Sequence, residues 1–90
     1  MSSRIDWALW RSFLAVAGTG SLSAAARALD LPQPTIGRHI DTLEAMVGQT
    51  LFLRTPQGLS VTETAALLVP EARAMQLTAA TRISFPGISP

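Results

Sequence analysis

The chain has 90 residues, which suffice for one small domain with a modest core but not for a separate ligand-binding or catalytic domain. Hydrophobic residues make up 48% and charged residues 14%, so we expect part of the apolar surface to meet another chain. The net charge of +1 does not by itself indicate a nucleic-acid binder, and the lack of cysteine excludes disulfides, thiol catalysis and thiolate metal sites.

A first helix is predicted from Asp6 to about Gly18, with Asp6 as the N-cap and Gly18 and Gly20 at the end. Charges at Arg4, Asp6 and Arg11 interrupt any apolar run, so this segment predicts neither a signal peptide nor a membrane span, and we expect a cytoplasmic protein. The apolar positions cover about half of the helix, which fits either a well-buried helix or one with two apolar faces. Ala8, Arg11, Ser12 and Ala15 lie outside the apolar half. On the second interpretation, Leu9, Phe13 and Val16 face the core, while Trp10 and Leu14 face a partner helix.

Two further helices are predicted, Ser21 to Leu29 and Gln33 to Val47, joined by the turn Asp30-Leu31-Pro32. Ser21 or Ser23 caps the first of them, and Gly48 ends the second. Two short helices joined by a tight turn after a longer helix form the helix-turn-helix pattern. Apolar residues at spacings of four, three and four give the second helix an inward face of Ile36, Ile40, Leu43 and Val47.

A β-hairpin is predicted next, with strands at 51–53 and 59–61 and a turn from Arg54 to Gly58, which would form a wing. Thr62 is predicted to cap a last helix that runs to about Arg82, and Pro70 inside this helix predicts a bend. Residues 83–90 have no periodicity and are predicted to be irregular.

These elements predict a mostly α fold, a winged helix-turn-helix over residues 1–61 followed by a linker and dimerisation helix over 62–82. Apolar side chains on the first and last helices exceed what a monomer should expose, so a homodimer is expected. The candidate dimerisation residues are Trp10, Leu14, Leu68, Val69, Ala72 and Met75.

Several separated segments, in this order along the chain, carry a resemblance to a known family. They are FLAVA (13–17), GSLSAAARAL (20–29), QPTIGRHI (33–40), LE (43–44), Gly48, LFLR (51–54) and LSVT (59–62). Together they resemble the N-terminal domain of LysR-type transcriptional regulators over about residues 5 to 82. The resemblance implies a DNA-binding transcription regulator that dimerises through the last helix and binds an imperfect inverted repeat in double-stranded DNA. Family members continue into an α/β domain that binds a small-molecule effector, and we expect that domain to be absent from these residues.

The outward side of the 33–47 helix is the candidate surface for the major groove, because a recognition helix reads base edges mostly with its N-terminal residues. Arg38 could span guanine O6 and N7 or contact only a phosphate, and the resemblance implies a position at the DNA surface. Gln33 could pair with adenine, and Thr35 could meet a thymine methyl or a phosphate. The candidate DNA-binding residues are Ser21, Ser23, Gln33, Pro34, Thr35, Arg38, His39, Thr42 and Arg54.

Two positions depart from the family pattern, since Pro32 and Gly37 stand where the family often has Ser. Pro32 removes a helix cap, and Gly37 removes a possible contact and weakens the helix by about 1 kcal/mol relative to Ala. Two candidates keep alternative roles. Ser21 could act as an N-cap alone, without contacting a phosphate. Arg54 could form an ion pair with a carboxylate such as Glu44 in place of a contact with DNA.

His39 is the only histidine, and without cysteine or paired carboxylates at ligand spacing it cannot anchor a metal site, so neither a metal nor a cofactor is expected. No nucleophile stands beside a base, which predicts a protein that is not an enzyme. The alternative function is a winged-helix module that binds protein. The polar outward face of Gln33, Thr35 and Arg38 favours DNA, because a protein-binding face should be apolar or acidic.

Overall fold

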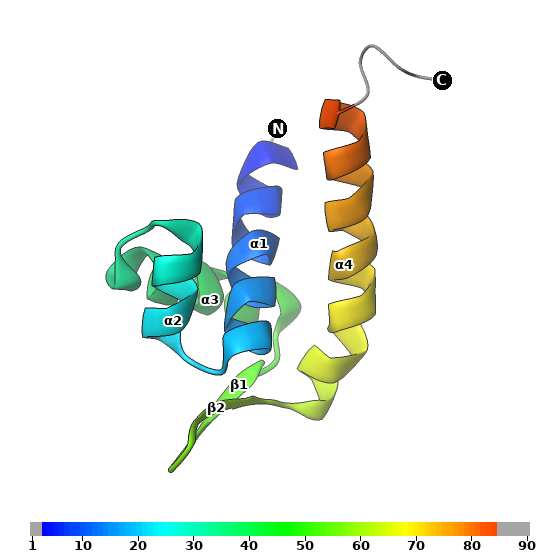
Figure 1. Ribbon diagram of the computed structural model, residues 1–90. Coiled ribbons are helices and arrows are strands. Elements are labelled where there is room, and N and C mark those ends of the chain that lie inside the picture. The colour runs from blue at the N-terminus through cyan, green and yellow to red at the C-terminus, as the bar shows by residue number, and fades with distance from the viewer. Residues whose placement is uncertain (1–2, 85–90) are drawn as a thin grey trace.

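The computed structural model describes the backbone of residues 3–84 and the side-chain environment of residues 7–75. Figure 1 shows α1 in the middle, with α2 and α3 on one side, α4 on the other, and a two-stranded hairpin at one end. The mostly helical fold predicted from the sequence is therefore confirmed. The elements are α1 (Ser3–Thr19), α2 (Leu22–Leu29), α3 (Gln33–Val47), β1 (Phe52–Thr55), β2 (Gly58–Val61) and α4 (Glu63–Ser84).

The first helix is longer than its pattern predicts. It begins at Ser3, so Asp6 lies inside the helix and the prediction that Asp6 is its N-cap is wrong. It ends at Thr19, whose hydroxyl donates to the Ala15 carbonyl at 2.8 Å. Gly20 then turns the chain with φ of 79°, a left-handed conformation in which a glycine has no steric penalty.

The core is a single apolar cluster built around α1. Leu9, Phe13 and Val16 are buried, as predicted, together with residues from every other helix and the hairpin. The ring of Phe13 meets Trp10 edge-to-face at 5.4 Å between centroids and Phe52 at 5.6 Å. Such aromatic pairs add about 0.5–1.5 kcal/mol each to the effect of burial, so this series joins α1 to the hairpin.

The helix-turn-helix follows from a left-handed turn at the end of α2. Asp30 has φ of 59° and ψ of 47°, and the amide of Leu31 donates back to the Ala26 carbonyl at 2.9 Å. This arrangement satisfies carbonyls that the helix end leaves free. The bounds of α3 and its end at Gly48, with φ of 77°, agree with the prediction.

The hairpin has a tighter turn than the sequence predicted. The strands pair Thr55 with Gly58, so only Pro56 and Gln57 lie between them, and the predicted five-residue turn is wrong. The Thr55 hydroxyl explains the difference, because it donates to the Gly58 carbonyl at 3.0 Å and accepts from the Gln57 amide at 3.2 Å. This local bonding replaces the longer loop.

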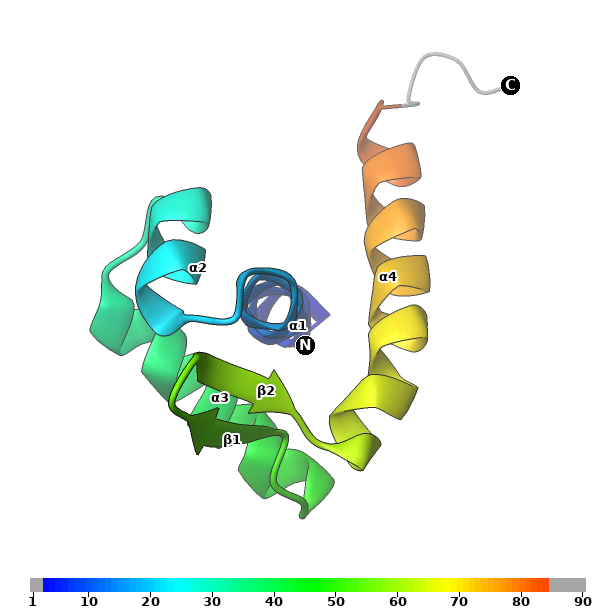
Figure 2. The ribbon, with the colours of Figure 1, turned by 60° about the horizontal axis from the view of Figure 1, so that its bottom comes forward.

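The last helix begins where predicted. The Thr62 hydroxyl accepts a hydrogen bond from the Ala65 amide at 3.2 Å. The same hydroxyl donates to the Thr50 carbonyl at 2.7 Å. The helix continues past Pro70, and Figures 1 and 2 show its first turns tilted against the rest. It extends to Ser84, so residues 83 and 84 are not irregular as predicted, and the rest of the predicted tail lies outside the described residues. No helix in the described part of the chain is long and apolar enough to cross a membrane.

Candidate nucleic-acid interface

The two sides of α3 differ as the sequence predicts. Ile36, Ile40 and Leu43 are buried, while Val47 is only half-buried because it stands at the end of the helix. On the opposite side the exposed candidates are Gln33, Pro34, Arg38 and Thr42, and Thr35 and His39 are half-buried. From Gln33 to Thr42 the helix therefore presents a mainly polar surface outward and an apolar one to α1, while the exposed side of its last turn carries Met46.

The start of α3 has no side-chain cap. Pro32 occupies the N-cap position, and only its carbonyl is used, accepting from the amides of Thr35 at 3.0 Å and Ile36 at 3.3 Å. Pro34 in the first turn has no amide hydrogen to satisfy. The loss of the family's cap at Pro32, predicted from the sequence, is thus confirmed.

His39, the neighbour of Arg38, makes a contact that is not predicted from the sequence. Ser12, predicted to lie outside, is fully buried in α1, and its hydroxyl lies 2.7 Å from Nδ1 of His39. The signal was present in the spacing, because Ser12 is three residues after Leu9 and four before Val16 and so shares their face. Partial burial, then the positive charges of Arg38 and Arg11, lower the pKa of His39 from its ordinary value.

Arg54 is exposed on β1 and is paired across the hairpin with Leu59. The predicted alternative was an ion pair with Glu44. The Glu44 carboxylate instead accepts from the amides of Leu51 at 2.8 Å and Phe52 at 3.4 Å, where it holds the entry to β1. The guanidinium of Arg54 extends from the hairpin without that partner.

The start of α2 uses one of its two serines as a cap. The Ser21 hydroxyl accepts from the Ala24 amide at 2.9 Å, so of the two predicted caps Ser21 is the one used. Ser23 is exposed, with its hydroxyl 3.4 Å from that of Ser21. Both hydroxyls stand at a helix N-terminus, where backbone amides favour an anion.

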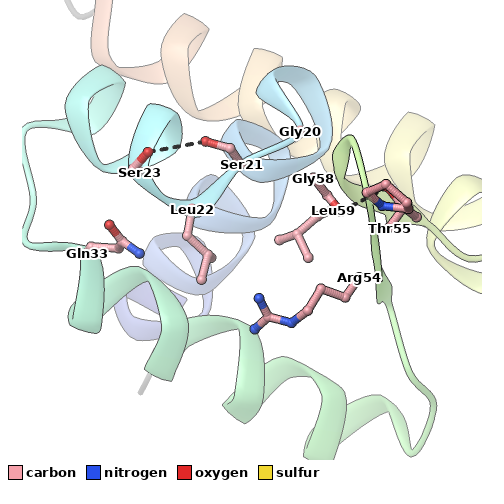
Figure 3. Close-up of a pocket in the computed structure, with 10 residues that line it drawn as sticks. Gly20, Ser21, Leu22, Ser23, Gln33, Arg54, Thr55, Gly58 and Leu59 are labelled. Atoms are coloured by element: carbon pink, nitrogen blue, oxygen red, sulfur yellow. Dashed lines mark hydrogen bonds between the residues drawn. The ribbon is translucent and has the colours of Figure 1, made fainter.

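The start of α2, the start of α3 and the hairpin surround one hollow of about 410 Å³ (Figure 3). Figure 3 shows Arg54 extending from the hairpin toward α3 and Gln33 facing the hollow from the start of α3. Four candidates from distant parts of the sequence, Ser21, Ser23, Gln33 and Arg54, line it. Figure 2 shows the hairpin, α3 and the beginning of α2 on the same side of the molecule.

A backbone hydrogen bond holds the hairpin against the turn that precedes α2. The Leu59 amide donates to the Gly20 carbonyl at 2.9 Å, next to the point where Gly58 passes Gly20. From the sequence, Gly20 is predicted only to end a helix and Gly58 only to be part of a turn. Two glycines far apart in the sequence carry no signal that they meet.

The candidate dimerisation residues lie mostly between α1 and α4. Trp10, Leu14, Leu68 and Val69 are half-buried and pack against the core, and Met75 is 39% exposed. Ala72 is 1% exposed within the single chain, because it lies on the side of α4 that packs into the core with α1. Leu67, which was not among the candidates, is the most exposed large apolar side chain of the described residues at 71%.

A three-helix core with a tight hairpin, an uncapped polar helix facing outward and a long following helix defines a winged helix-turn-helix of the DNA-binding class. Residues 7–66 match the family described as bacterial regulatory helix-turn-helix proteins of the lysR family. The chain belongs to this family.

Known proteins agree with this assignment. The chain is 43% identical over 65 residues to PtxE of Stutzerimonas stutzeri and 43% identical over 63 residues to the HTH-type transcriptional regulator ClcR of Pseudomonas putida. The matches cover 72% and 70% of this chain but only 33% and 21% of those proteins.

Two solved DNA complexes have the same fold. The CbnR_DBD–DNA complex matches with a TM-score of 0.79 and 32% identity over 84% of this chain and 87% of that one. The complex of BenM_DBD with benA site 1 DNA matches with a TM-score of 0.79 and 26% identity over 87% and 88%.

Proposed function

We propose that the chain binds double-stranded DNA with the outward side of α3 in the major groove and the hairpin beside the phosphate backbone. The observation that carries the proposal is the hollow where Ser21, Ser23, Gln33 and Arg54 meet. Its guanidinium, amide and two hydroxyls are the groups that contact phosphates and base edges. The likeness to two solved DNA complexes supports DNA as the partner.

Within this surface, we assign base reading to the first turns of α3. Gln33, Thr35 and Arg38 stand at its N-terminal half, and Thr42 lies farther along beside the exposed acid Asp41. An acidic side chain is repelled by phosphates, so the N-terminal half suits the groove better. A protein-binding surface would instead be apolar, and this one carries amide, hydroxyl and guanidinium groups.

The functional unit is a homodimer that binds an inverted repeat. Leu67 and Met75 leave apolar surface exposed on α4, and Trp10 and Leu68 line a small hollow beside Met75. A two-fold dimer presents two copies of α3 to half-sites spaced by about 10 base pairs for each helical turn. We assign the chain no catalysis and place it in the cytoplasm with its DNA, as a regulator of this family.

The test is selection of binding sequences from a pool of random duplexes, followed by titration of the recovered duplex with the wild-type chain and Arg38→Ala. We expect an inverted repeat, and a loss of affinity for Arg38→Ala of about 5- to 150-fold, which corresponds to about 1–3 kcal/mol for a bidentate base contact. Arg27→Ala is the matched control, because Arg27 is also an exposed arginine but lies on α2 and not on the outward side of α3.

The result distinguishes the two roles left open for Arg38. If the selected sequence relaxes at one position in Arg38→Ala, the side chain reads a base, whereas a uniform loss over all sequences means a phosphate contact. Equal affinity of Arg38→Ala and Arg27→Ala would overturn the assignment of this surface.

A further inference from the structure

The hydrogen bond between Ser12 and His39 joins the interior of α1 to the middle of α3. Ser12 is the one fully buried polar side chain among the described residues, and His39 Nδ1 lies 2.7 Å from its hydroxyl. A buried hydroxyl without a hydrogen-bond partner is unfavourable, because nothing replaces the water that it loses. The imidazole therefore provides the hydrogen-bond partner that the buried Ser12 hydroxyl needs. The same hydrogen bond fixes the position of the ring.

The orientation of the ring follows from this contact. Because Nδ1 is bound on the interior side, the hydrogen-bonding direction of Nε2 diverges from Ser12. His39 is half-buried and follows the exposed Arg38 directly in the sequence. Nε2, the ring nitrogen that Ser12 does not bind, thus belongs to a side chain of α3, the helix that holds the proposed DNA-reading residues.

The two charged side chains that shift the pKa of the ring are both positive. Arg38 acts on it from α3 and Arg11 from α1, and with partial burial they lower the pKa of His39. Among the described residues, no carboxylate forms an ion pair with the imidazole. A DNA phosphate placed next to these arginines would reverse the sign of the local field and favour the protonated ring.

We propose that Ser12 is a positioning residue for DNA binding, holding His39 by Nδ1 so that Nε2 meets a DNA phosphate, and that His39 takes up a proton when the complex forms. This inference rests on the DNA-reading surface proposed above. It adds a titrating contact to that surface and makes the affinity for DNA depend on pH.

The proton balance is simple. In the free chain the neutral ring accepts the Ser12 hydroxyl hydrogen at Nδ1 and carries its own hydrogen on Nε2. On binding, a proton from water adds to Nδ1, which then donates to the Ser12 oxygen. The serine hydroxyl turns toward a carbonyl of the preceding helical turn, as helical serines commonly do. Nε2–H donates to the phosphate as a charge-assisted bond.

The first experiment measures affinity for a fluorescent random-sequence duplex at constant ionic strength between about pH 6 and 8, the range in which histidine titrates. We expect wild-type affinity to rise several-fold as the pH falls, with a limit of about tenfold per pH unit for one proton. His39→Gln should bind with a flatter profile, because its amide does not titrate. Ser12→Ala should flatten the profile in part, whereas Ser12→Thr, which keeps the hydroxyl, should retain it.

A second experiment needs no variant that might fold poorly. His39 is the only histidine, so its imidazole resonances can be followed by NMR without ambiguity, free and bound to the same duplex. We expect the pKa of His39 to rise on binding. An unchanged pKa, or equal pH profiles for wild type and His39→Gln, would overturn this inference alone. An affinity that is independent of Arg38 would instead contradict the proposed DNA surface.

Discussion

The carbonyl oxygen of Gly20 lies 2.6 Å from the point that a Cβ on Gly58 would occupy. Real Cβ atoms essentially never come so close to backbone, so the α1–α2 turn and the hairpin can meet only because Gly58 has no side chain. Gly58 also has φ of 127°, a conformation that residues with a Cβ rarely adopt. The position of the wing beside α2 therefore depends on this glycine.

Replacing Gly58 with Ala should destabilise the fold. The new Cβ must displace the Gly20 carbonyl and also adopt the unfavourable φ, so we expect a loss of at least about 2 kcal/mol in the free energy of unfolding. Urea denaturation followed by circular dichroism measures this loss. The Leu59–Gly20 hydrogen bond, at 2.9 Å, should be disrupted as well.

Gly18→Ala is the matched control. A Cβ at Gly18 meets nothing within 4 Å, and the residue lies inside α1. Alanine is the better helix former, so stability should be unchanged or should increase by up to about 1 kcal/mol. Equal effects of the two substitutions would contradict the close approach at Gly58.

Glu44 should matter for stability and not for DNA reading. Its carboxylate accepts from the amides of Leu51 and Phe52, and hydrogen bonds to charged groups are worth about 1.5–3 kcal/mol. We expect Glu44→Ala to lower the free energy of unfolding by about 2 kcal/mol. Glu44→Gln should lose less, because the amide oxygen still accepts.

Asp41 provides the comparison for Glu44, because it is an exposed acid on the same helix. Asp41→Ala should change stability by no more than about 0.5 kcal/mol. The same denaturation experiment on all three variants decides the point. A Glu44→Ala protein as stable as Asp41→Ala would mean that the carboxylate does not hold the start of β1.

Arg54 should contribute to the salt dependence of DNA binding. Each phosphate neutralised by a cation adds about 0.9 to the magnitude of the slope of log affinity against log salt. Arg54→Ala should therefore reduce that slope by about 1 and weaken binding to all sequences alike. Arg27→Ala should leave it unchanged, and a slope that is the same for wild type and Arg54→Ala would remove the wing from the proposed interface.

The proposed dimer can be tested at Met75. This side chain is 39% exposed on α4 beside Trp10 and Leu68, and burial of a Met contributes about 1.5–3 kcal/mol. Met75→Lys should weaken dimerisation by about tenfold or more in sedimentation equilibrium. Met46→Lys is the control, because Met46 is 58% exposed but lies on α3. A chain that stays monomeric at high micromolar concentration would contradict the dimer itself.

Periodicity and turn residues were enough to predict α3 to the residue, and the cap at Thr62, because both depend on local sequence. The contacts that position the site join distant segments. Ser12 meets His39 across 27 residues, and Gly58 meets Gly20 across the whole helix-turn-helix. A polar residue on a helix predicts exposure by default, so the burial of Ser12 could be inferred only from its spacing to Leu9.

The lowered pKa of His39 also predicts how stability depends on pH. Below the ordinary pKa of about 6.5, the unfolded chain binds a proton at His39 that the folded chain resists, because partial burial, Arg38 and Arg11 disfavour the charged ring. The unfolded state thus binds more protons between the folded and unfolded pKa values. The stabilisation is fully present well above pH 6.5 and declines as the pH falls through that value toward the folded pKa.

Thermal or urea unfolding of the free chain between about pH 5 and 8 measures this dependence. Wild type should lose stability as the pH falls below about 6.5, and His39→Gln should lose less over the same interval, because glutamine does not titrate. Stability and DNA affinity then move in opposite directions with pH, since the proton that opposes folding of the free chain favours the complex. A wild-type profile that coincides with that of His39→Gln would show that the ring titrates as freely in the folded chain as in the unfolded one.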